Sequence, residues 1–292
     1  MDFNTKNIMV NKKKVDKKPN TTGHDWDGIQ EYNIPAPRWW LIVWIICIIW
    51  AFGYWVFYPT WPTPSGNSKG ALKWTSPSQL KDSQKEISTR QNVYLQEFTN
   101  STFAEIQKNP KLMEFALQGG RAAFKENCAA CHGSGASGSK GFPNLNDDDW
   151  LWGGKIEDIE QTLLYGIRSG HDKTRLSQMP SFGLDDILQK DEIAAVAQYV
   201  LSLSDKEKYN KKGHEIFKTN CVSCHGINAK GDRKVGSPNL TDSIWLYDSD
   251  KSEILYTINY ARSGVMPYFK GRLDEQTIRQ LAIYVHSLGG GE

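Results

Sequence analysis

The sequence predicts a mainly α-helical protein in which one N-terminal transmembrane helix is followed by two tandem helical domains. Three observations predict this class. Residues 39–58 carry no charge, the pentapeptide Cys-x-x-Cys-His occurs twice, and residues 120–133 match residues 213–226 at eight of fourteen positions. Signals of β-strands are weak along the whole chain, so we expect helices and loops to build both domains.

The first predicted element is a membrane-spanning helix over residues 39–58. A helix of this length spans about 30 Å, which matches the hydrocarbon thickness of a bilayer. Aromatic residues gather toward its ends, as in membrane-interface belts: Trp39, Trp40, Trp55, Tyr58 and Trp61. A signal peptide would be shorter and would end in a small-residue cleavage site, and a buried helix of a soluble protein is rarely apolar on every side. We therefore expect one uncleaved anchor, in which Cys47 is a small apolar residue.

The charges that flank this helix predict its orientation. Seven basic residues precede it: Lys6, Lys12, Lys13, Lys14, Lys17, Lys18 and Arg38. The twenty residues after it carry only Lys69 and Lys73. Because positive flanks stay in the cytoplasm, residues 1–38 are predicted to be a cytoplasmic segment. Residues 59–118 are predicted to form a linker beyond the membrane, stiffened by prolines near the helix and helical over 79–99 and 102–118, with an interruption at Pro110.

The two copies of Cys-x-x-Cys-His predict two covalently attached haem groups of the c type. The copies comprise Cys128, Cys131 and His132 in the first and Cys221, Cys224 and His225 in the second. Two thiols three residues apart on a helical turn share a face, where each can form a thioether with a haem vinyl group. The next residue then offers its imidazole to the iron. A zinc ribbon would need a closer second Cys pair, and a thioredoxin-like site would need a βαβ context, which the sequence lacks.

The surroundings of the two motifs reveal an internal duplication. Pro143-Asn144-Leu145 returns as Pro238-Asn239-Leu240, Trp150-Leu151 as Trp245-Leu246, and Arg168-Ser169-Gly170 as Arg262-Ser263-Gly264. We therefore predict two class I cytochrome c domains, the first over residues 119–206 and the second over 207–292. Each repeat begins with a helix that carries the haem motif and ends with an amphipathic helix, so we expect each domain to close on its own final helix.

Each repeat also contains one methionine at a matching place after its haem motif. These are Met179 and Met266, and both precede a proline that fixes the backbone. A thioether as the sixth iron ligand favours ferrous iron and raises the reduction potential. We expect each Met to serve the haem of its own repeat; the alternative is ordinary core packing. His171 is the rival sixth ligand for the first haem, but the second repeat has no equivalent of it.

Two arginines are shared by the repeats and precede the methionines. Arg168 and Arg262 are candidates for pairing with haem propionates, with a solvated salt bridge as the alternative. His171, His214 and His286 are interpreted as surface or propionate-side groups, and no role is assigned to His24. No residues that could hold copper are evident.

Composition and charge set further bounds. The formal net charge is +2, and no basic stripe suggests binding to nucleic acid. Four of the five cysteines belong to the haem motifs, and haem is attached outside the cytoplasm, in agreement with the predicted orientation. Acidic runs at residues 147–149 and at Asp248 and Asp250 could steer a basic donor cytochrome or form ordinary solvated loops, and both interpretations stay open.

The N-terminal residues carry a family resemblance. Residues 21–31 (TTGHDWDGIQE), followed by Asn33, Pro35 and Pro37-Arg38-Trp39-Trp40 and a single anchor, resemble the start of the dihaem subunit III (CcoP/FixP) of cbb3-type cytochrome c oxidase. Residues 166–180 also resemble the first haem domain of that family. The resemblance extends over the anchor and both haem domains and is looser over residues 65–118.

This resemblance implies a place in a proton-pumping terminal oxidase of the bacterial inner membrane, used for respiration at low oxygen. The linker and haem domains would then be periplasmic. The chain would accept electrons from a soluble periplasmic cytochrome c. It would pass them toward the haem–copper catalytic subunit, beside a monohaem cytochrome c subunit. Oxygen reduction would occur in the catalytic subunit, because this chain is expected only to transfer electrons.

Two alternatives stay open. The first is an independent membrane-anchored dihaem electron shuttle for another respiratory enzyme. The second is an enzyme in its own right, such as a dihaem peroxidase, in which one iron lacks its Met ligand. The matched Met179 and Met266 argue against the peroxidase.

Overall fold

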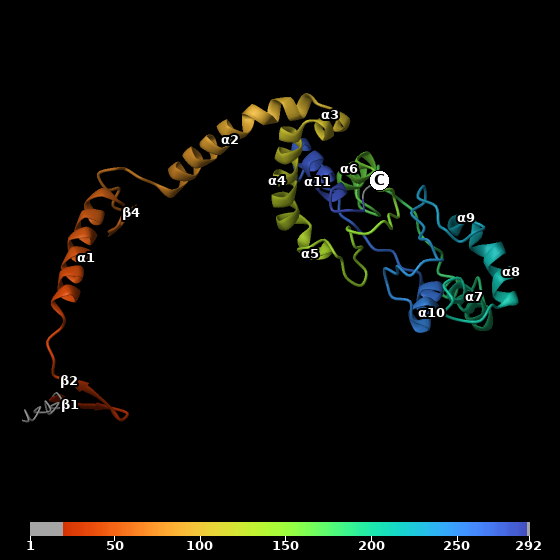
Figure 1. Ribbon diagram of the computed structural model, residues 1–292, viewed down its shortest axis with the longest axis horizontal. Coiled ribbons are helices and arrows are strands. Elements are labelled where there is room, and N and C mark those ends of the chain that lie inside the picture. Colours follow the sequence, from red (N-terminus) through yellow and green to blue (C-terminus); the bar gives the residue numbers. More distant parts are fainter. Residues whose placement is uncertain (1–19, 291–292) are drawn as a thin grey trace, which may run out of the picture. The chain divides into compact units, whose positions relative to one another are not determined.

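The computed structural model describes residues 20–290 (Figure 1). The chain divides into two compact units, residues 1–87 and 88–292. The first unit carries the apolar helix and the second carries both haem motifs. The predicted mainly helical class is confirmed in both units. The lysines before residue 20, on which the predicted orientation depends, lie outside the described residues.

The first unit opens with a small antiparallel hairpin that the sequence analysis did not anticipate. Strands β1 (Thr21–Trp26) and β2 (Ile29–Tyr32) pair around a two-residue turn. Asp27 and Gly28 have φ values of 52° and 87°, which is the left-handed conformation that tight hairpin turns require. The Gly28 N–H donates to Asp25 Oδ1 at 2.7 Å and holds the turn.

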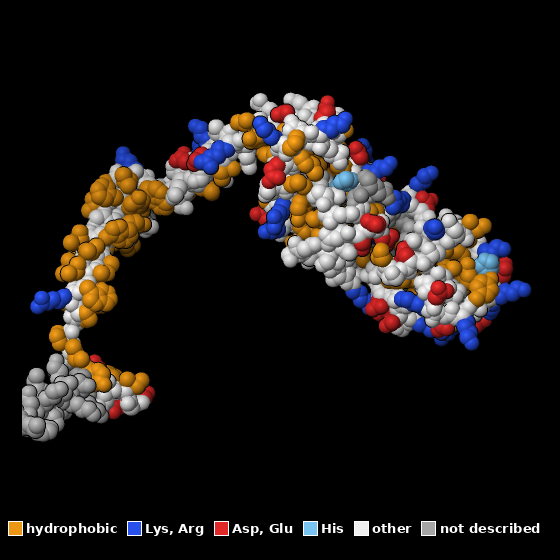
Figure 2. Space-filling view, in the orientation of Figure 1, with side chains coloured by type: hydrophobic (Ala, Val, Ile, Leu, Met, Phe, Trp, Pro, Cys, Tyr) orange, Lys and Arg blue, Asp and Glu red, His pale blue; other side chains and the backbone are white. Residues whose placement is uncertain are grey.

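Helix α1 (Arg38–Phe57) is the apolar helix that the sequence predicts. It is long and apolar enough to span a membrane, no other helix in the described part of the chain meets that test, and Figure 2 shows it covered with hydrophobic side chains. Strands β3 (Pro62–Thr63) and β4 (Gly66–Asn67) follow it. The chain then returns to the end of α1, where the Ala71 N–H donates to Val56 O at 2.9 Å.

Polar helices lead into the second unit. Helix α2 (Ser76–Asn100) begins in the first unit and ends in the second. Helix α3 (Phe103–Lys108) starts at a capping box between Thr102 and Glu105, which satisfies the free N–H groups of its first turn. Helix α4 (Pro110–Asn127) has its proline at the first position, where no N–H is needed. The predicted interruption at Pro110 is therefore the boundary between α3 and α4.

The second unit contains two hydrophobic cores. The first core is formed by α4, α5 (Ala129–His132), α6 (Ile156–Tyr165) and α11 (Glu275–His286). The second core is formed by α7 (Lys190–Ser202), α8 (Lys211–Asn220), α9 (Val222–His225) and α10 (Lys251–Tyr260). Each core holds one haem motif, in α4–α5 or in α8–α9, and Figure 1 shows the two groups of helices.

The two repeats exchange their final helices. Helix α11, from the second repeat, packs on α4 of the first, and α7, from the first repeat, packs on α8 of the second. The expectation that each domain closes on its own final helix is therefore wrong. The two sequence repeats remain, but each core is assembled from both of them.

Equivalent glycines make both crossings possible. A Cβ atom on Gly120 would lie 2.3 Å from Gln280 O, and a Cβ on Gly213 would lie 2.0 Å from Ala195 O. The helix backbones therefore approach more closely than any side chain would allow. Gly120 and Gly213 hold the same place in the two repeats, so the two interfaces have the same construction.

One contact distinguishes the exchanged arrangement from the expected one. The guanidinium of Arg279 on α11 donates to three carbonyls at the end of α2: Phe98 O at 3.0 Å, Thr99 O at 3.2 Å and Ser101 O at 2.5 Å. Its carbon also lies 5.1 Å from the centre of the Phe98 ring. The equivalent residue of α7 is Ala194, which has no such donor.

We expect Arg279→Met to lower the free energy of unfolding by about 2 kcal/mol, because the carbonyls at the end of α2 lose charged hydrogen bonds. Hydrogen–deuterium exchange should increase over residues 98–106. Arg272→Met is the matched control, since Arg272 contacts the Phe269 ring and not α2. If Arg279→Met changed neither stability nor exchange at the end of α2, helix α11 would not lie on the first core.

Candidate haem sites

The two Cys-x-x-Cys-His motifs have the same local structure. Cys128 ends α4 and precedes the short helix α5, and Cys221 ends α8 and precedes α9. The backbone N–H groups of His132 and His225 donate to Cys128 O at 3.0 Å and to Cys221 O at 2.9 Å. This single helical turn places the second Cys and the His three and four residues after the first Cys, at neighbouring positions on the helix surface, as the spacing predicts.

Each motif histidine is held in one tautomer by a carbonyl. His132 Nδ1 lies 3.1 Å from Pro143 O, and His225 Nδ1 lies 3.2 Å from Pro238 O. A carbonyl oxygen can only accept, so Nδ1 carries the proton and Nε2 keeps its lone pair for a metal. The two prolines belong to the repeated Pro-Asn-Leu segments, to which the sequence analysis assigned no role.

Burial reinforces the metal-binding form of these side chains. It lowers the pKa of His132 and of His225, and this effect outweighs the hydrogen bond to the proline carbonyl, which raises the pKa. Both imidazoles are therefore neutral at neutral pH, as an iron ligand must be. Burial also raises the pKa of Cys128 and Cys221 to about 11, with the second thiol of each motif adding to the effect.

The methionines lie with the opposite motifs from those expected. Met266 packs against the first core, which includes Cys128. Met179 packs against the second core, as Cys221 also does. Each Met therefore packs against the core that holds the motif of the other repeat. The ligation of either haem iron by a Met stays a prediction.

Backbone pairing holds both methionine segments on the other repeat. Ile167 and Met266 exchange N–H···O bonds of 3.0 Å in both directions. The segment after Met179 pairs with the end of α10, where the Phe182 N–H donates to Ile258 O at 3.0 Å. The exchange of helices and the exchange of methionines are therefore parts of one arrangement.

The rival ligand His171 lies between two aromatic rings. Its ring centre is 4.9 Å from that of Tyr165 and 5.3 Å from that of Tyr268. Its Nδ1 accepts the Lys173 N–H at 3.0 Å. His214 likewise packs against Tyr199, at 5.0 Å between ring centres. Both histidines therefore have structural contacts of their own.

The two arginines differ although their sequence positions correspond. Arg168 donates from Nε to Gly264 O at 2.7 Å and from a terminal nitrogen to Ser177 O at 2.8 Å. Arg262 instead pairs with Glu253, and its guanidinium carbon lies 4.5 Å from the centre of the Tyr247 ring. Neither arginine is a freely solvated surface charge.

Two buried donors fit an anionic group beside the second core. Among the described residues, the buried side-chain nitrogen and oxygen atoms without a partner are Trp245 Nε1 and Arg262 Nε. A buried donor without a partner costs free energy, and a haem propionate would supply the missing acceptor. In the sequence, Trp245 stands out only as part of the duplication. Its indole N–H is the one feature that could have predicted a contact with a propionate.

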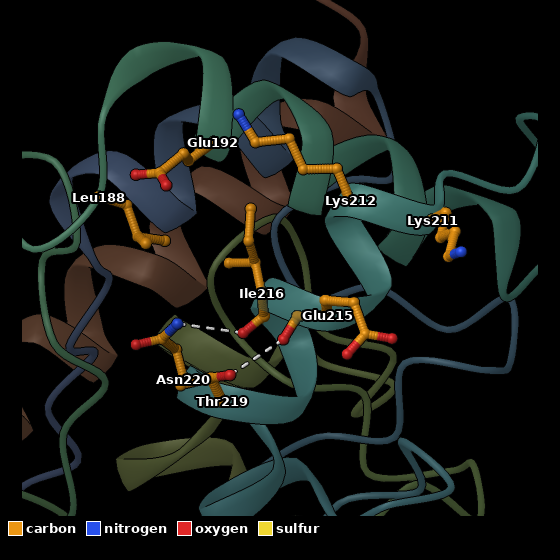
Figure 3. Close-up of a pocket in the computed structure, with 8 residues that line it drawn as sticks. All are labelled: Leu188, Glu192, Lys211, Lys212, Glu215, Ile216, Thr219 and Asn220. Carbon is orange, nitrogen blue, oxygen red and sulfur yellow. Dashed lines mark hydrogen bonds between the residues drawn. The ribbon is translucent and has the colours of Figure 1, made fainter.

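One surface groove is separate from the haem motifs. It has a volume of about 580 Å³ and is lined by residues of α7, α8 and the segment before α7 (Figure 3). Leu188 and Ile216 supply its apolar side chains, while Thr219 and Asn220 bond back to the carbonyls of α8. No residue of either motif lines it.

A second cavity is lined by part of the acidic run at residues 147–149. It has a volume of about 480 Å³ and lies between residues 148–151 of the first repeat and residues 230–244 of the second. Burial raises the pKa of Asp149 to about 6, and Asp242 and Asp147 add to the shift. At least Asp149 is therefore part of a contact between the repeats rather than of an ordinary solvated loop.

Comparisons with known proteins match the N-terminal region and both repeats. Residues 18–65 match the family model described as the N-terminal domain of cytochrome oxidase-cbb3, FixP. Residues 117–204 match the model of cytochrome c, and residues 209–285 match that of cytochrome c oxidase, cbb3-type, subunit III. The two cytochrome c domains imply covalently bound haem c.

Relatives match nearly the whole chain. A cbb3-type cytochrome c oxidase subunit FixP from Bradyrhizobium sp. (strain ORS 278) is 52% identical over 276 residues, covering 93% of this chain and 95% of the relative. The FixP subunit of Rhizobium meliloti is 46% identical, covering 93% and 95%. The CcoP subunit of Cereibacter sphaeroides is 44% identical, covering 94% and 96%. This chain therefore belongs to the FixP/CcoP family of cbb3-type cytochrome c oxidase subunits.

Proposed function

We propose that this chain is a membrane-anchored dihaem cytochrome c of a cbb3-type oxidase. It relays electrons from a soluble periplasmic cytochrome c to the haem–copper catalytic subunit. The observation that carries the proposal is the repeated motif geometry. In each copy a proline carbonyl holds Nδ1 of the histidine that follows the two cysteines, which leaves Nε2 available to an iron. Haem c supplies one-electron chemistry through the ferric and ferrous states of its iron.

We propose that each haem is held by residues of both repeats. Cys128 and Cys131 would form the thioethers of the first haem, and His132 and Met266 would ligate its iron. The thioethers of the second haem are formed by Cys221 and Cys224, and its axial ligands are His225 and Met179. The packing of each Met against the opposite motif supports this pairing. Two protein ligands leave no open position on either iron, so oxygen reduction is assigned to the catalytic subunit.

We further propose that Arg262 and Trp245 donate to a propionate of the second haem. Their buried nitrogens without a partner support this role. Arg168 is less suited to a propionate, because two carbonyls already use two of its donors.

The membrane and the other subunits define the setting. Helix α1 serves as the single anchor in the bacterial inner membrane, with the N-terminus in the cytoplasm and both cores in the periplasm. Arg38, the first residue of α1, agrees with that orientation. The proposed partners in the complex are the haem–copper subunit and a monohaem cytochrome c subunit. The names of the relatives support membership of a cbb3-type oxidase.

Purification of the native complex tests the function. A reduced-minus-oxidised spectrum with pyridine haemochrome analysis should show haem c together with haem b, copper and oxygen uptake. If two haem c groups per chain were recovered with none of these, under conditions that keep complexes intact, the chain would be an independent shuttle. A high-spin haem in the isolated chain would indicate the peroxidase instead.

The axial pairing has its own test in chains that carry one haem. In Cys221→Ser/Cys224→Ser, the remaining haem should keep its Met–iron absorption band. Met266→Ala should then abolish that band and lower the reduction potential, because a thioether favours ferrous iron. Met179→Ala should leave the band in place. If Met179→Ala abolished the band and Met266→Ala left it in place, each Met would instead ligate the haem of its own repeat.

Removal of the indole N–H tests the propionate contact. Trp245→Phe should lower the reduction potential of the second haem, because an unpaired propionate charge favours ferric iron. The Met–iron bands of both haems should persist. Trp150→Phe is the matched control, since the Trp150 indole donates to the backbone carbonyl of Gly290. Equal potentials in Trp245→Phe and the parent would exclude the contact.

A further inference from the structure

One guanidinium connects the two methionine segments. Arg168 Nε donates to Gly264 O at 2.7 Å, and Gly264 precedes Met266 by two residues. A terminal nitrogen of the same side chain donates to Ser177 O at 2.8 Å, and Ser177 precedes Met179 by two residues. The two carbonyls therefore occupy corresponding places before the two methionines.

The backbone around Arg168 is firmly held. Its φ of 49° is left-handed, which is uncommon for a residue with a side chain and persists where the surroundings impose it. The Arg168 N–H donates to Arg175 O at 2.9 Å. The neighbouring Ile167 is paired in both directions with Met266. The side chain thus extends from a rigid base, directly beside one of the two segments that it joins.

The arrangement is peculiar to Arg168. Its counterpart Arg262 is paired with Glu253 and packs on Tyr247. A shared structural role in both repeats would give the two arginines the same partners. One arginine connects both segments instead, and it lies where the exchange of helices brings the two repeats together.

We propose that Arg168 is a positioning residue for both axial methionines at once. This rests on the proposed axial ligation by Met179 and Met266. The planar guanidinium directs two donors at fixed angles, so it sets the spacing of the two segments as well as holding each one. Displacement of either segment strains the hydrogen bond to the other. The ligation of the two haems is therefore coupled, and the coupling is reciprocal.

The test uses the full-length chain with both haems. Arg168→Gln and Arg168→Lys are each made in Met179→His and in Met266→His, because each of these backgrounds retains one Met–iron absorption band. Arg175→Gln is the matched control. Arg175 lies on the same loop and is largely buried, but it bonds to Thr162 and Asp158 and to neither methionine segment. The intensity of the Met–iron band is measured in the oxidised protein, and the reduction potential is measured by redox titration.

Arg168→Gln should raise the fraction of iron without its Met roughly tenfold in both backgrounds, since each segment loses one charged hydrogen bond. Arg168→Lys should rescue at most one of the two bands, because an ammonium lacks the fork geometry. Arg175→Gln should lower the melting temperature and leave both bands intact.

Three results would overturn the proposal. The first is a weaker Met–iron band in only one of the two backgrounds. The second is a lowered melting temperature with both bands intact, as expected for the control. The third is a shifted potential with both bands intact, which would assign Arg168 to a propionate. Absence of the single Met–iron band from both parent backgrounds would refute the axial ligation itself, so the two failures are distinguishable.

Discussion

The close crossing of helices between the repeats is the interaction on which the rest of the second unit depends. Gly120 and Gly213 let the backbones of α11 and α7 approach α4 and α8 at distances that no Cβ would permit. These crossings bury the apolar faces of all four helices and fix which repeat completes which core. The methionine segments then run beside the opposite motif, because the chain must travel from one core to the other to deliver its final helix.

Within that framework each motif is built in the same way from local and distant parts. The helical turn of Cys-x-x-Cys-His places the thiols and the imidazole, and the carbonyl of Pro143 or Pro238 selects the tautomer that leaves Nε2 as a ligand. The surroundings of the two motifs then diverge. The unpaired donors of Trp245 and Arg262 lie by the second core, whereas Trp150 donates to the C-terminal backbone. Two haems bound at these motifs would therefore meet different polar surroundings, which would set two different reduction potentials.

The sequence was sufficient for the features that depend on neighbouring residues. The haem motifs, the apolar helix and the boundary at Pro110 are local patterns, and the structure places them as predicted. The pairing of helices depends on residues far apart in the sequence, and the duplication makes that pairing ambiguous. Helices α7 and α11 present the same apolar pattern, so either fits either core by periodicity alone. The difference lies at positions such as Arg279, where α7 has Ala194. The partners of Arg279 at the end of α2 become evident only in three dimensions. The β1–β2 hairpin was missed because its Asp-Gly turn is flanked by strands too short and polar to show alternation.

An interlocked pair of cores suits the proposed electron relay better than two independent domains would. Two domains on a flexible tether sample many separations, and the rate of electron transfer between their haems would vary with each one. Here the final helix of each repeat is part of the other core, and Ile167, Met266 and Arg168 join the segments between them. The separation of the two motifs is therefore set by packing, since any movement of one core must break buried contacts of the other. Duplication followed by exchange of helices thus turns two copies of a small haem domain into one unit with a fixed internal geometry.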